Sequence, residues 1–436
     1  MRAGDLVDLV ITDLSPAGDG IGTLPEYAPA SDDPSVPPAR EVHVPGAFPG
    51  EVAGIRLLHV SRQHPRAHAE LRQLRQPHPS RRDPPCPHHG LAGACNGCPL
   101  LPLPVAIQRE LKADLLARTH DLHVDRVVAS PREFAYRWSS KRVLGGTPGR
   151  ITLGSYTRGT HQVVAMDTCR VEHPVILAAA DELRAAADAL EIEPDTDLRY
   201  AWFKTDGHDL LLTLVTRDHA SRAARELPAR LHRPVGIAWS VQPCHGNNLR
   251  GEPPVLLRGR GELRFGFEGV TVSVGPLGFL QPNPATAALA YHDLLRDEHG
   301  ALLTGARAFD LYAGAGITTA LLRQNFKTVE ASEAYSESAA SLGIDPETTE
   351  SFLQRPHTTP DLVLANPPRE GLGSDVCAAL VHLAPPRINI MSCGPAGLAR
   401  DLAALSARYH LAGLRAYDTL PHTPHIELVA WLVRRG

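Results

Sequence analysis

Apolar and polar residues alternate through the first sixty positions, as in DLVDLVITDL and EVHVPGAFPGEVAGIRLLHV. A period of two is typical of half-buried strands, and the glycines and prolines between these runs mark turns. The segment EYAPASDDPSVPPAR, residues 26–40, is rich in proline, serine and aspartate and predicts a loop between two strands. We expect residues 1–74 to form a small OB-like β-barrel.

The pattern changes after the predicted barrel. Residues 101–121 have helical periodicity, and we expect this helix to pack on the C-terminal part of the chain. Between about 130 and 270, strand-like runs such as RITLGSY surround a second predicted helix near 174–190. We expect residues 75–275 to form a central domain of mixed α+β structure.

From residue 276 onward, strand-like and helical segments alternate. ARAFDLYAGAGITTALLR predicts a strand, a glycine turn and a helix, and RINIMSCGPAGLARDL predicts another strand and helix. This succession predicts an α/β fold in residues 276–436, with a Rossmann-like, doubly wound parallel sheet. Ligands of such sheets bind at the carboxyl ends of the strands.

One candidate nucleoside site lies at the first of these strand ends. Asp310 precedes a glycine turn whose Gly314 would let a ligand approach the backbone closely. Glu333, at the end of the next strand, could accept the two ribose hydroxyls, with Glu330 as the alternative. Thr319 stands where a dinucleotide fingerprint has its third glycine. An adenosine without a pyrophosphate, as in S-adenosylmethionine, therefore fits better than a dinucleotide.

Later strand ends carry reactive side chains. Asn366 and Arg369 follow an apolar strand in LANPPREG, where the two prolines would aim them into the cleft. Cys393 stands between a strand and a helix, where the helix dipole would lower its pKa and favour a nucleophilic thiolate. Glu427 begins the last apolar strand and is a candidate general base. The alternatives are an ordinary turn and a buried structural cysteine.

Composition adds a candidate nucleic-acid surface. The formal net charge is −4, yet residues 54–82 contain a single acid, Glu70, and seven arginines. These are Arg56, Arg62, Arg66, Arg72, Arg75, Arg81 and Arg82. A local basic stripe is typical of phosphate binding, although a solvated arginine-rich face is the alternative. No apolar run reaches membrane-spanning length and the N-terminus lacks signal-peptide features, so we expect a cytoplasmic protein.

Four of the seven cysteines have spacing typical of a metal site. Cys86, Cys95 and Cys98 are close together, and Cys169 follows in MDTCRV. Such a set suits a [4Fe–4S] cluster, with zinc as the alternative and His88 or His89 as a further ligand.

Taken together, the motifs resemble one family over nearly the whole chain. DLSPAGDGIGTL and VHVPGAFPGE look like TRAM-domain signatures, and GFLQPNP at 278–284 resembles the family's FFQxN segment. DLYAGAG, NPPREG, SCGPAGLARDL and PHTPHIE follow in the family's order. The chain resembles the RNA (uracil-C5)-methyltransferases that carry an N-terminal TRAM domain and an iron–sulfur cluster.

The resemblance implies a mechanism and a substrate. Cys393 would attack C6 of uracil, C5 would take the methyl group of S-adenosylmethionine, and Glu427 would remove the C5 proton. The substrate implied is RNA, with 23S ribosomal RNA favoured and tRNA uridine-54 as the alternative, and we expect a monomer. The remaining implied residues bind S-adenosylmethionine, frame the site or, for Arg369, support the uracil: Gln281, Tyr312, Glu333, Asn366 and Arg369.

Three residues depart from the family pattern. Asn366 replaces an aspartate, Gly394 replaces the asparagine of SCNP, and Gly397 replaces a threonine. The stretch between Glu333 and Asn366 is also shorter than usual. Two other hypotheses therefore stay open: an RNA-binding member that does not methylate, and an amino-group methyltransferase that uses NPPR.

Overall fold

The computed structural model describes residues 2–24, 41–61, 64, 66–90, 95–244 and 251–436. The predicted loop at 26–40 lies outside these residues. The chain divides into two compact units, one of residues 1–119 with 420–425 and one of residues 120–419 with 426–436. In the described part of the chain, no helix is long and apolar enough to cross a membrane.

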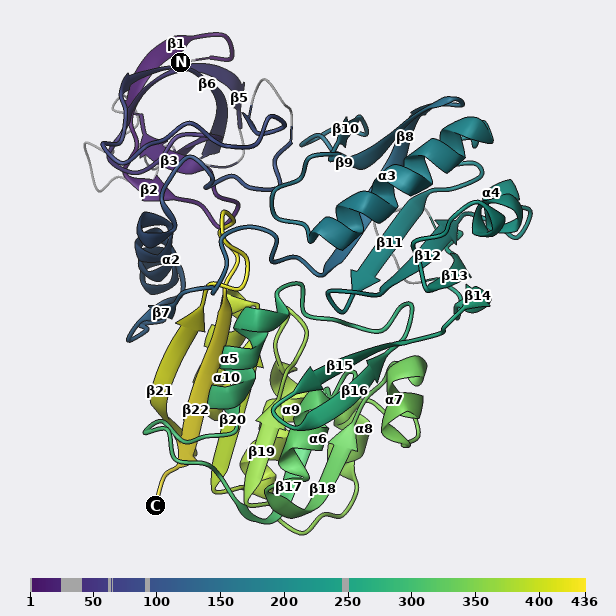
Figure 1. Cartoon of the computed structure of the whole chain (residues 1–436). Coiled ribbons are helices and arrows are strands. Elements are labelled where there is room, and N and C mark those ends of the chain that lie inside the picture. The colour runs from purple at the N-terminus through teal and green to yellow at the C-terminus, as the bar shows by residue number, and fades with distance from the viewer. Residues whose placement is uncertain (1, 25–40, 62–63, 65, 91–94, 245–250) are drawn as a thin grey trace. The chain divides into compact units, whose positions relative to one another are not determined.

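The first unit contains one curved six-stranded sheet (Figure 1). Alternating side chains such as Leu9, Ile11, Ile55 and Leu57 fill its interior, as the period of two predicts. The strand order is β1-β5-β6-β4-β3-β2. The bounds are β1 Leu6–Val10, β2 Asp13–Leu14, β3 Gly20–Thr23, β4 Glu41–Val44, β5 Val52–Val60 and β6 Arg66–Gln76.

The helix predicted at 101–121 is α2, Val105–His120. It starts later than predicted because Pro102 and Pro104 precede it. Its buried Lys112 donates to the carbonyl oxygens of Leu420 and His425, at 3.3 and 3.1 Å. Within its unit, α2 therefore contacts a short C-terminal segment of the sequence.

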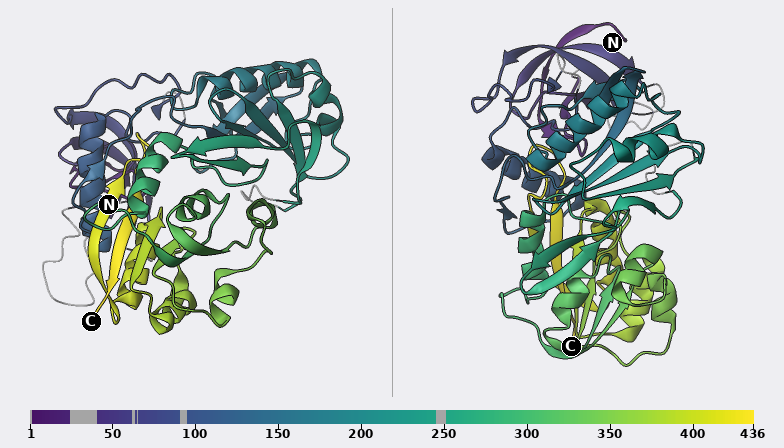
Figure 2. Two further views of the ribbon diagram at one scale, coloured as in Figure 1. Left: turned by 60° about the horizontal axis from the view of Figure 1, so that its bottom comes forward. Right: turned by 45° about the vertical axis from the view of Figure 1, so that its right-hand side comes forward.

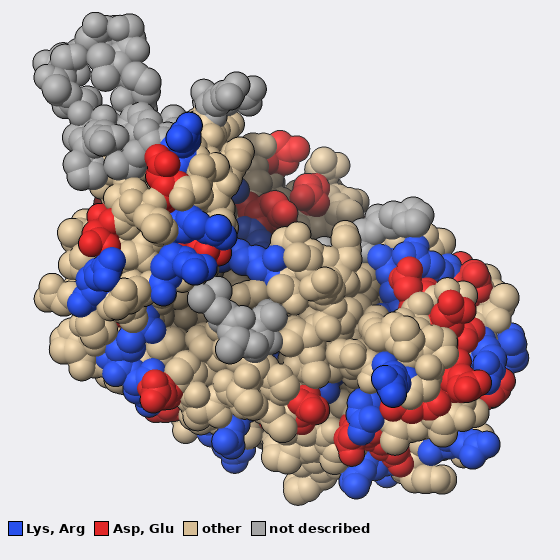
Figure 3. Space-filling view, turned by 90° about the horizontal axis from the view of Figure 1, so that it is seen from above, with Lys and Arg blue, Asp and Glu red and all other residues tan. Residues whose placement is uncertain are grey.

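Ion pairs neutralise much of the predicted arginine stripe. Arg56 and Arg72 both donate to Glu70, and Arg75 donates to Asp8. Arg81 forms hydrogen bonds with the buried Glu51 carboxylate. Basic and acidic side chains are interspersed on the face in Figure 3. Arg62 lies outside the described residues, and the RNA-binding role of this surface stays a prediction.

The second unit contains a seven-stranded sheet of order β10-β9-β8-β11-β12-β13-β14. Helix α3, Pro174–Ala189, buries Ile176, Ala180 and Leu183 against it, and these residues have helical spacing. The strands are β8 Ser139–Thr147, β9 Arg150–Tyr156, β10 Val163–Ala165, β11 Tyr200–Thr205, β12 Leu210–Thr216, β13 Gly236–Val241 and β14 Val255–Gly259. Short elements α4 (Arg222–Glu226), η2 (Leu227–Ala229), β15 (Leu263–Phe267) and β16 (Val270–Val274) complete this part.

A second seven-stranded sheet of this unit has the order β18-β17-β19-β20-β22-β21-β7 and helices on both faces (Figures 1 and 2). The α/β fold class is therefore confirmed. The strands are β7 Val127–Val128, β17 Gly305–Leu311, β18 Phe326–Ser332, β19 Leu362–Ala365, β20 Arg387–Ser392, β21 Tyr409–Tyr417 and β22 Glu427–Arg434. The helices are α5 Pro284–Leu294, α6 Ile317–Leu322, α7 Ser336–Leu342, α8 Thr349–Gln354, α9 Gly373–Leu383 and α10 Pro395–Leu405.

Two features of this sheet differ from the prediction. It is mixed rather than wholly parallel, because β22 runs antiparallel between β20 and β21. The usual doubly wound order also places a strand beyond β18. Residues 333–361 form only α7 and α8 as regular elements, so β18 is the edge strand. The short stretch before β19 therefore supplies no strand beyond β18.

Candidate active site

The parallel register brings the predicted strand-end residues to one edge of the sheet. Leu311 of β17 pairs with Ser332 of β18 and Ala365 of β19. The residues that follow, Tyr312, Glu333 and Asn366, therefore lie side by side at the carboxyl edge. The backbone N–H of Asn366 donates to the Leu311 carbonyl oxygen at 3.2 Å.

Glu333 faces the glycine turn. Its carboxylate accepts hydrogen bonds from the N–H of Gly314 at 2.8 Å and of Tyr335 at 2.7 Å. Gly314 has a φ of +56°, and a Cβ there would meet no atom within 4 Å, so the turn faces open space. Glu330 instead pairs with Arg307 and His357. Glu333, and not Glu330, therefore contacts the glycine turn, and its role as the nucleoside carboxylate stays a prediction.

The residues around this turn are unusual in conformation and protonation. Tyr312 has a φ of +60°, and burial raises its pKa to about 12. Asp310 is fully buried, and burial raises its pKa to about 6. The hydroxyls of Thr318 and Thr319 donate to its Oδ2 at 2.8 and 2.5 Å. Thr319, which replaces the third glycine, therefore orients the Asp310 carboxyl.

Cys393 and Glu427 lie side by side because of the antiparallel pairing of β20 and β22. Ser392 of β20 pairs with Leu428 of β22. The next position toward the edge is therefore Cys393 after β20 and Glu427 at the start of β22. The thiol is exposed, whereas Glu427 is buried, with 4% of its surface accessible. Two segments far apart in sequence thus place a thiol and a carboxyl at the same edge.

The predicted lowering of the Cys393 pKa is wrong. Partial desolvation and the nearby Glu427 carboxylate raise the pKa of the thiol. Arg369 acts in the opposite direction through its charge and a hydrogen bond to the thiol. The start of α10 does not outweigh the two raising effects.

The pKa of Glu427, the second residue of the predicted catalytic pair, is also raised. Burial raises the pKa of its carboxyl to about 8, and the positive charge of Arg369 partly opposes this rise. Arg369 itself is exposed. It therefore interacts with both acidic groups while remaining accessible to a ligand.

Tyr291 is a buried site residue that the sequence patterns did not reveal. It lies in α5, forms a hydrogen bond with Gln281, and is close enough to Glu427 and Asp310 for their charges to raise its pKa. It links the Gln281 side of the site to the Glu427 side. A tyrosine inside an apolar helix gives no signal of its own, because core tyrosines have the same pattern.

Lys204 is a second residue that sequence reasoning missed. Its buried ammonium donates to the carbonyl oxygens of Gly275 at 2.9 Å and Pro276 at 2.8 Å, and also to that of Gly278. On the far side of the loop, Asn283 donates to the Thr419 carbonyl oxygen at 3.0 Å. These contacts fix the loop that carries Gln281. The chain has only four lysines, which was the available signal.

The predicted metal ligands are divided between the two units, with Cys86, Cys95 and Cys98 in the first and Cys169 in the second. In the first unit, the N–H of Cys95 donates to the His88 carbonyl oxygen at 2.9 Å. Among the described residues, which exclude 91–94, no three His, Cys, Asp or Glu side chains form a metal-binding group. In the second unit, burial raises the pKa of Cys169 to about 11, which opposes the thiolate form. Cys98, the remaining predicted ligand, is half-buried.

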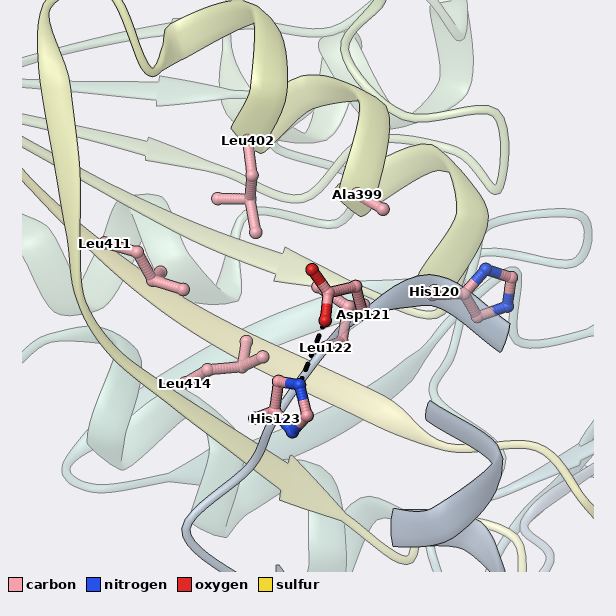
Figure 4. A pocket seen from close by; sticks show the side chains of 8 residues that line it. All are labelled: His120, Asp121, Leu122, His123, Ala399, Leu402, Leu411 and Leu414. Carbon is pink, nitrogen blue, oxygen red and sulfur yellow. Dashed lines mark hydrogen bonds and ion pairs between the residues drawn. The ribbon is translucent and has the colours of Figure 1, made fainter. Parts of the chain in front are cut away.

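A separate hollow lies on the outer side of α10 and contains none of the predicted site residues (Figure 4). Ala399 and Leu402 of α10 face Leu411 and Leu414 of β21 across it. The buried residues of α10 include Gly397, Leu398 and Asp401, and none of them lines the hollow. The hollow therefore lies apart from the candidate active site.

The architecture and the edge residues together define a class of protein. The sheet is doubly wound, and the carboxylate that follows β18 accepts a hydrogen bond from the glycine turn after β17. That turn lacks the third glycine of pyrophosphate-binding sites. This is the organisation of a Rossmann-like methyltransferase domain.

Comparisons with known proteins narrow this class. Residues 357–435 match the family described as tRNA (uracil-5-)-methyltransferase. An uncharacterized RNA methyltransferase of Geobacter sulfurreducens is 30% identical, over 100% of this chain and 91% of that protein. One of Thermosynechococcus vestitus is 29% identical, over 99% and 98%. The chain belongs to the family of RNA (uracil-5-)-methyltransferases.

A solved structure has the same fold. The Pyrococcus abyssi tRNA (uracil-54, C5)-methyltransferase in complex with S-adenosyl-L-homocysteine has a TM-score of 0.76 and 24% identity. The match covers 98% of this chain and 99% of that one.

Proposed function

We propose that this chain uses S-adenosylmethionine to form 5-methyluridine in RNA, with 23S ribosomal RNA as the substrate. The observation that carries the proposal is the pairing of Cys393 and Glu427, with Arg369 interacting with both, at the carboxyl edge of the sheet. An amino-group methyltransferase would need neither the thiol nor the buried carboxyl.

Cys393 supplies the nucleophile that uracil needs. Its thiolate forms a bond to C6, and the electron pair of the C5–C6 double bond makes C5 an enolate carbon. C5 then takes the methyl group, and the sulfonium of S-adenosylmethionine leaves as the neutral thioether. Arg369 favours the thiolate by its charge and its hydrogen bond.

Glu427 completes the reaction. Its carboxylate removes the C5 proton, the C5–C6 double bond re-forms, and the bond from C6 to the cysteine sulfur breaks. Burial raises the pKa of Glu427 to about 8, which makes it a stronger base than an exposed glutamate. A uridine must be unstacked to reach this edge of the sheet.

Methyl transfer from labelled S-adenosylmethionine to transcripts of 23S ribosomal RNA and of tRNA tests the proposal. We expect label in 5-methyluridine after nuclease digestion and chromatography. Label on an exocyclic amino group, or none with either RNA, would reject it. A tRNA uridine is the second candidate, because the solved structure of the same fold is described as a tRNA (uracil-54, C5)-methyltransferase.

Replacing Glu333 with glutamine is expected to weaken S-adenosylmethionine binding by about 10- to 100-fold. In the wild type, the two carboxylate oxygens of Glu333 accept hydrogen bonds from the N–H groups of Gly314 and Tyr335. A glutamine has only one acceptor oxygen, so it cannot accept from both N–H groups and from the ribose hydroxyls as well. Isothermal titration calorimetry measures the change. Glu330→Gln is the matched control and should bind normally, since Glu330 pairs with Arg307. Equal losses in both variants would contradict the assignment of the ribose site.

We also propose, from cysteine spacing and the family resemblance, that Cys86, Cys95, Cys98 and Cys169 hold a [4Fe–4S] cluster. Protein purified without oxygen should contain about four iron and four sulfide per chain. Cys95→Ser should lose most of both, and the control Cys244→Ser should keep them. Stoichiometric zinc without iron would reject this proposal.

A further inference from the structure

Two glycines that follow Cys393 have no room for a side chain. A Cβ at Gly397 would lie 2.7 Å from the Arg369 carbonyl oxygen and 2.8 Å from the Gly371 nitrogen. A Cβ at Gly394 would also collide with the backbone of Arg369. Gly394 has an ordinary φ of −115°, so close approach of another chain segment, rather than backbone conformation, requires the glycine.

The segment that approaches is the one that carries Arg369. Asp401, on the same buried face of α10 as Gly397, accepts hydrogen bonds from it. Its carboxylate oxygens lie 2.8 Å from the N–H of Leu372 and 3.3 Å from the N–H of Gly373. The backbone from Arg369 to Gly373 is therefore fixed directly on α10, the helix that begins two residues after Cys393.

We propose that Gly394, Gly397 and Asp401 are positioning residues that hold Arg369 against the Cys393 thiol. Packing of the Arg369 backbone on α10 fixes the point from which its side chain reaches the Cys393 sulfur. The proposal rests on the proposed function only for its effect on turnover. It also explains why Gly394 and Gly397 depart from the family pattern: in this chain a side chain at either position would displace the arginine segment.

The groups that bear on the thiol come from two elements. Arg369, from the loop after β19, lowers its pKa, and Glu427 of β22 raises it. Loss of Arg369 from its place leaves Glu427 unopposed. The pH at which Cys393 becomes reactive should then rise.

Alkylation of Cys393 by iodoacetamide, followed across pH by peptide mass spectrometry, tests the inference without RNA. Gly397→Ala and Asp401→Asn should each shift the midpoint upward in the same direction as Arg369→Gln. In a double variant with Arg369→Gln, Gly397→Ala should add no further shift, because the guanidinium through which it acts is gone. In turnover assays we expect kcat to fall by about 10- to 100-fold, with KM for S-adenosylmethionine nearly unchanged.

Two control variants match these changes. Gly266→Ala adds a Cβ that meets no atom within 4 Å, and Asp375→Asn removes an exposed charge from the first turn of α9. Both should keep the wild-type alkylation profile. Unshifted profiles in Gly397→Ala and Asp401→Asn, or shifts that add fully to that of Arg369→Gln, would overturn the positioning role. Shifted profiles in a protein that transfers no methyl group would reject the proposed function and leave the positioning role intact.

Discussion

Cys393→Ala is expected to lower the rate of 5-methyluridine formation by at least about 10⁴-fold, because the proposed mechanism activates C5 of uracil through attack of this thiol on C6. Cys393 is the exposed thiol beside Glu427 at the carboxyl edge of the sheet. Removing an exposed thiol should leave the fold and S-adenosylmethionine binding unchanged. The measurement is single-turnover methyl transfer together with calorimetric binding of the cofactor.

Cys244→Ala is the matched control, since Cys244 is also an exposed free cysteine but lies three residues after β13, away from the carboxyl edge of the second sheet. It should transfer methyl groups at the wild-type rate. Full activity in Cys393→Ala would mean that the methyl group goes to an atom that needs no nucleophile, such as an amino nitrogen.

A substrate analogue can show the covalent step directly. RNA with 5-fluorouridine at the target position has no C5 proton for a base to remove, so the adduct with Cys393 should persist. We expect a complex that survives denaturing electrophoresis for the wild type and Cys244→Ala, and none for Cys393→Ala.

The edge of the sheet could be predicted from the sequence because each residue there follows a recognisable strand. Glu333 and Asn366 end parallel strands, and parallel strand ends meet at one edge. Glu427 was predicted from a different signal, a charge at the start of an apolar strand. Antiparallel pairing of that strand then places it beside Cys393.

What could not be predicted depends on contacts between distant segments. Partial desolvation and the Glu427 carboxylate raise the pKa of Cys393 and Arg369 lowers it, and no local turn pattern includes these effects. Tyr291 and Lys204 act through hydrogen bonds to the loop around Gln281, and each has an ordinary local sequence. The only sequence signal that no strand lies beyond β18 was the short stretch between Glu333 and Asn366.

Glu427→Gln is expected to trap the methylated adduct on unmodified RNA. Attack by Cys393 and methyl transfer need no base at C5, whereas elimination does, so the amide variant should stop after methylation. A band of RNA-linked protein that carries the labelled methyl group should accumulate in denaturing gels. The control Glu262→Gln, at an exposed position, should release its product normally.

The same variant should change how stability depends on pH. The pKa of Glu427 is about 8 in the folded protein and near the ordinary 4.5 when unfolded. The folded state binds the proton more tightly, so the stabilising contribution is complete below pH 4.5 and is lost as the pH rises through 8. The loss amounts to a few kcal/mol, at about 1.4 kcal/mol per pKa unit.

Melting temperatures measured between pH 6 and pH 9 can detect this loss. Across that interval the melting temperature of the wild type should fall further than that of Glu427→Gln, which has no carboxyl to ionise. The melting temperature of Glu262→Gln should follow that of the wild type. Parallel curves for wild type and Glu427→Gln would show that the buried carboxyl is not protonated at neutral pH. An ionised carboxylate can accept the C5 proton directly, so that result would contradict the raised pKa of Glu427 and leave its role as the base to the adduct-trapping experiment.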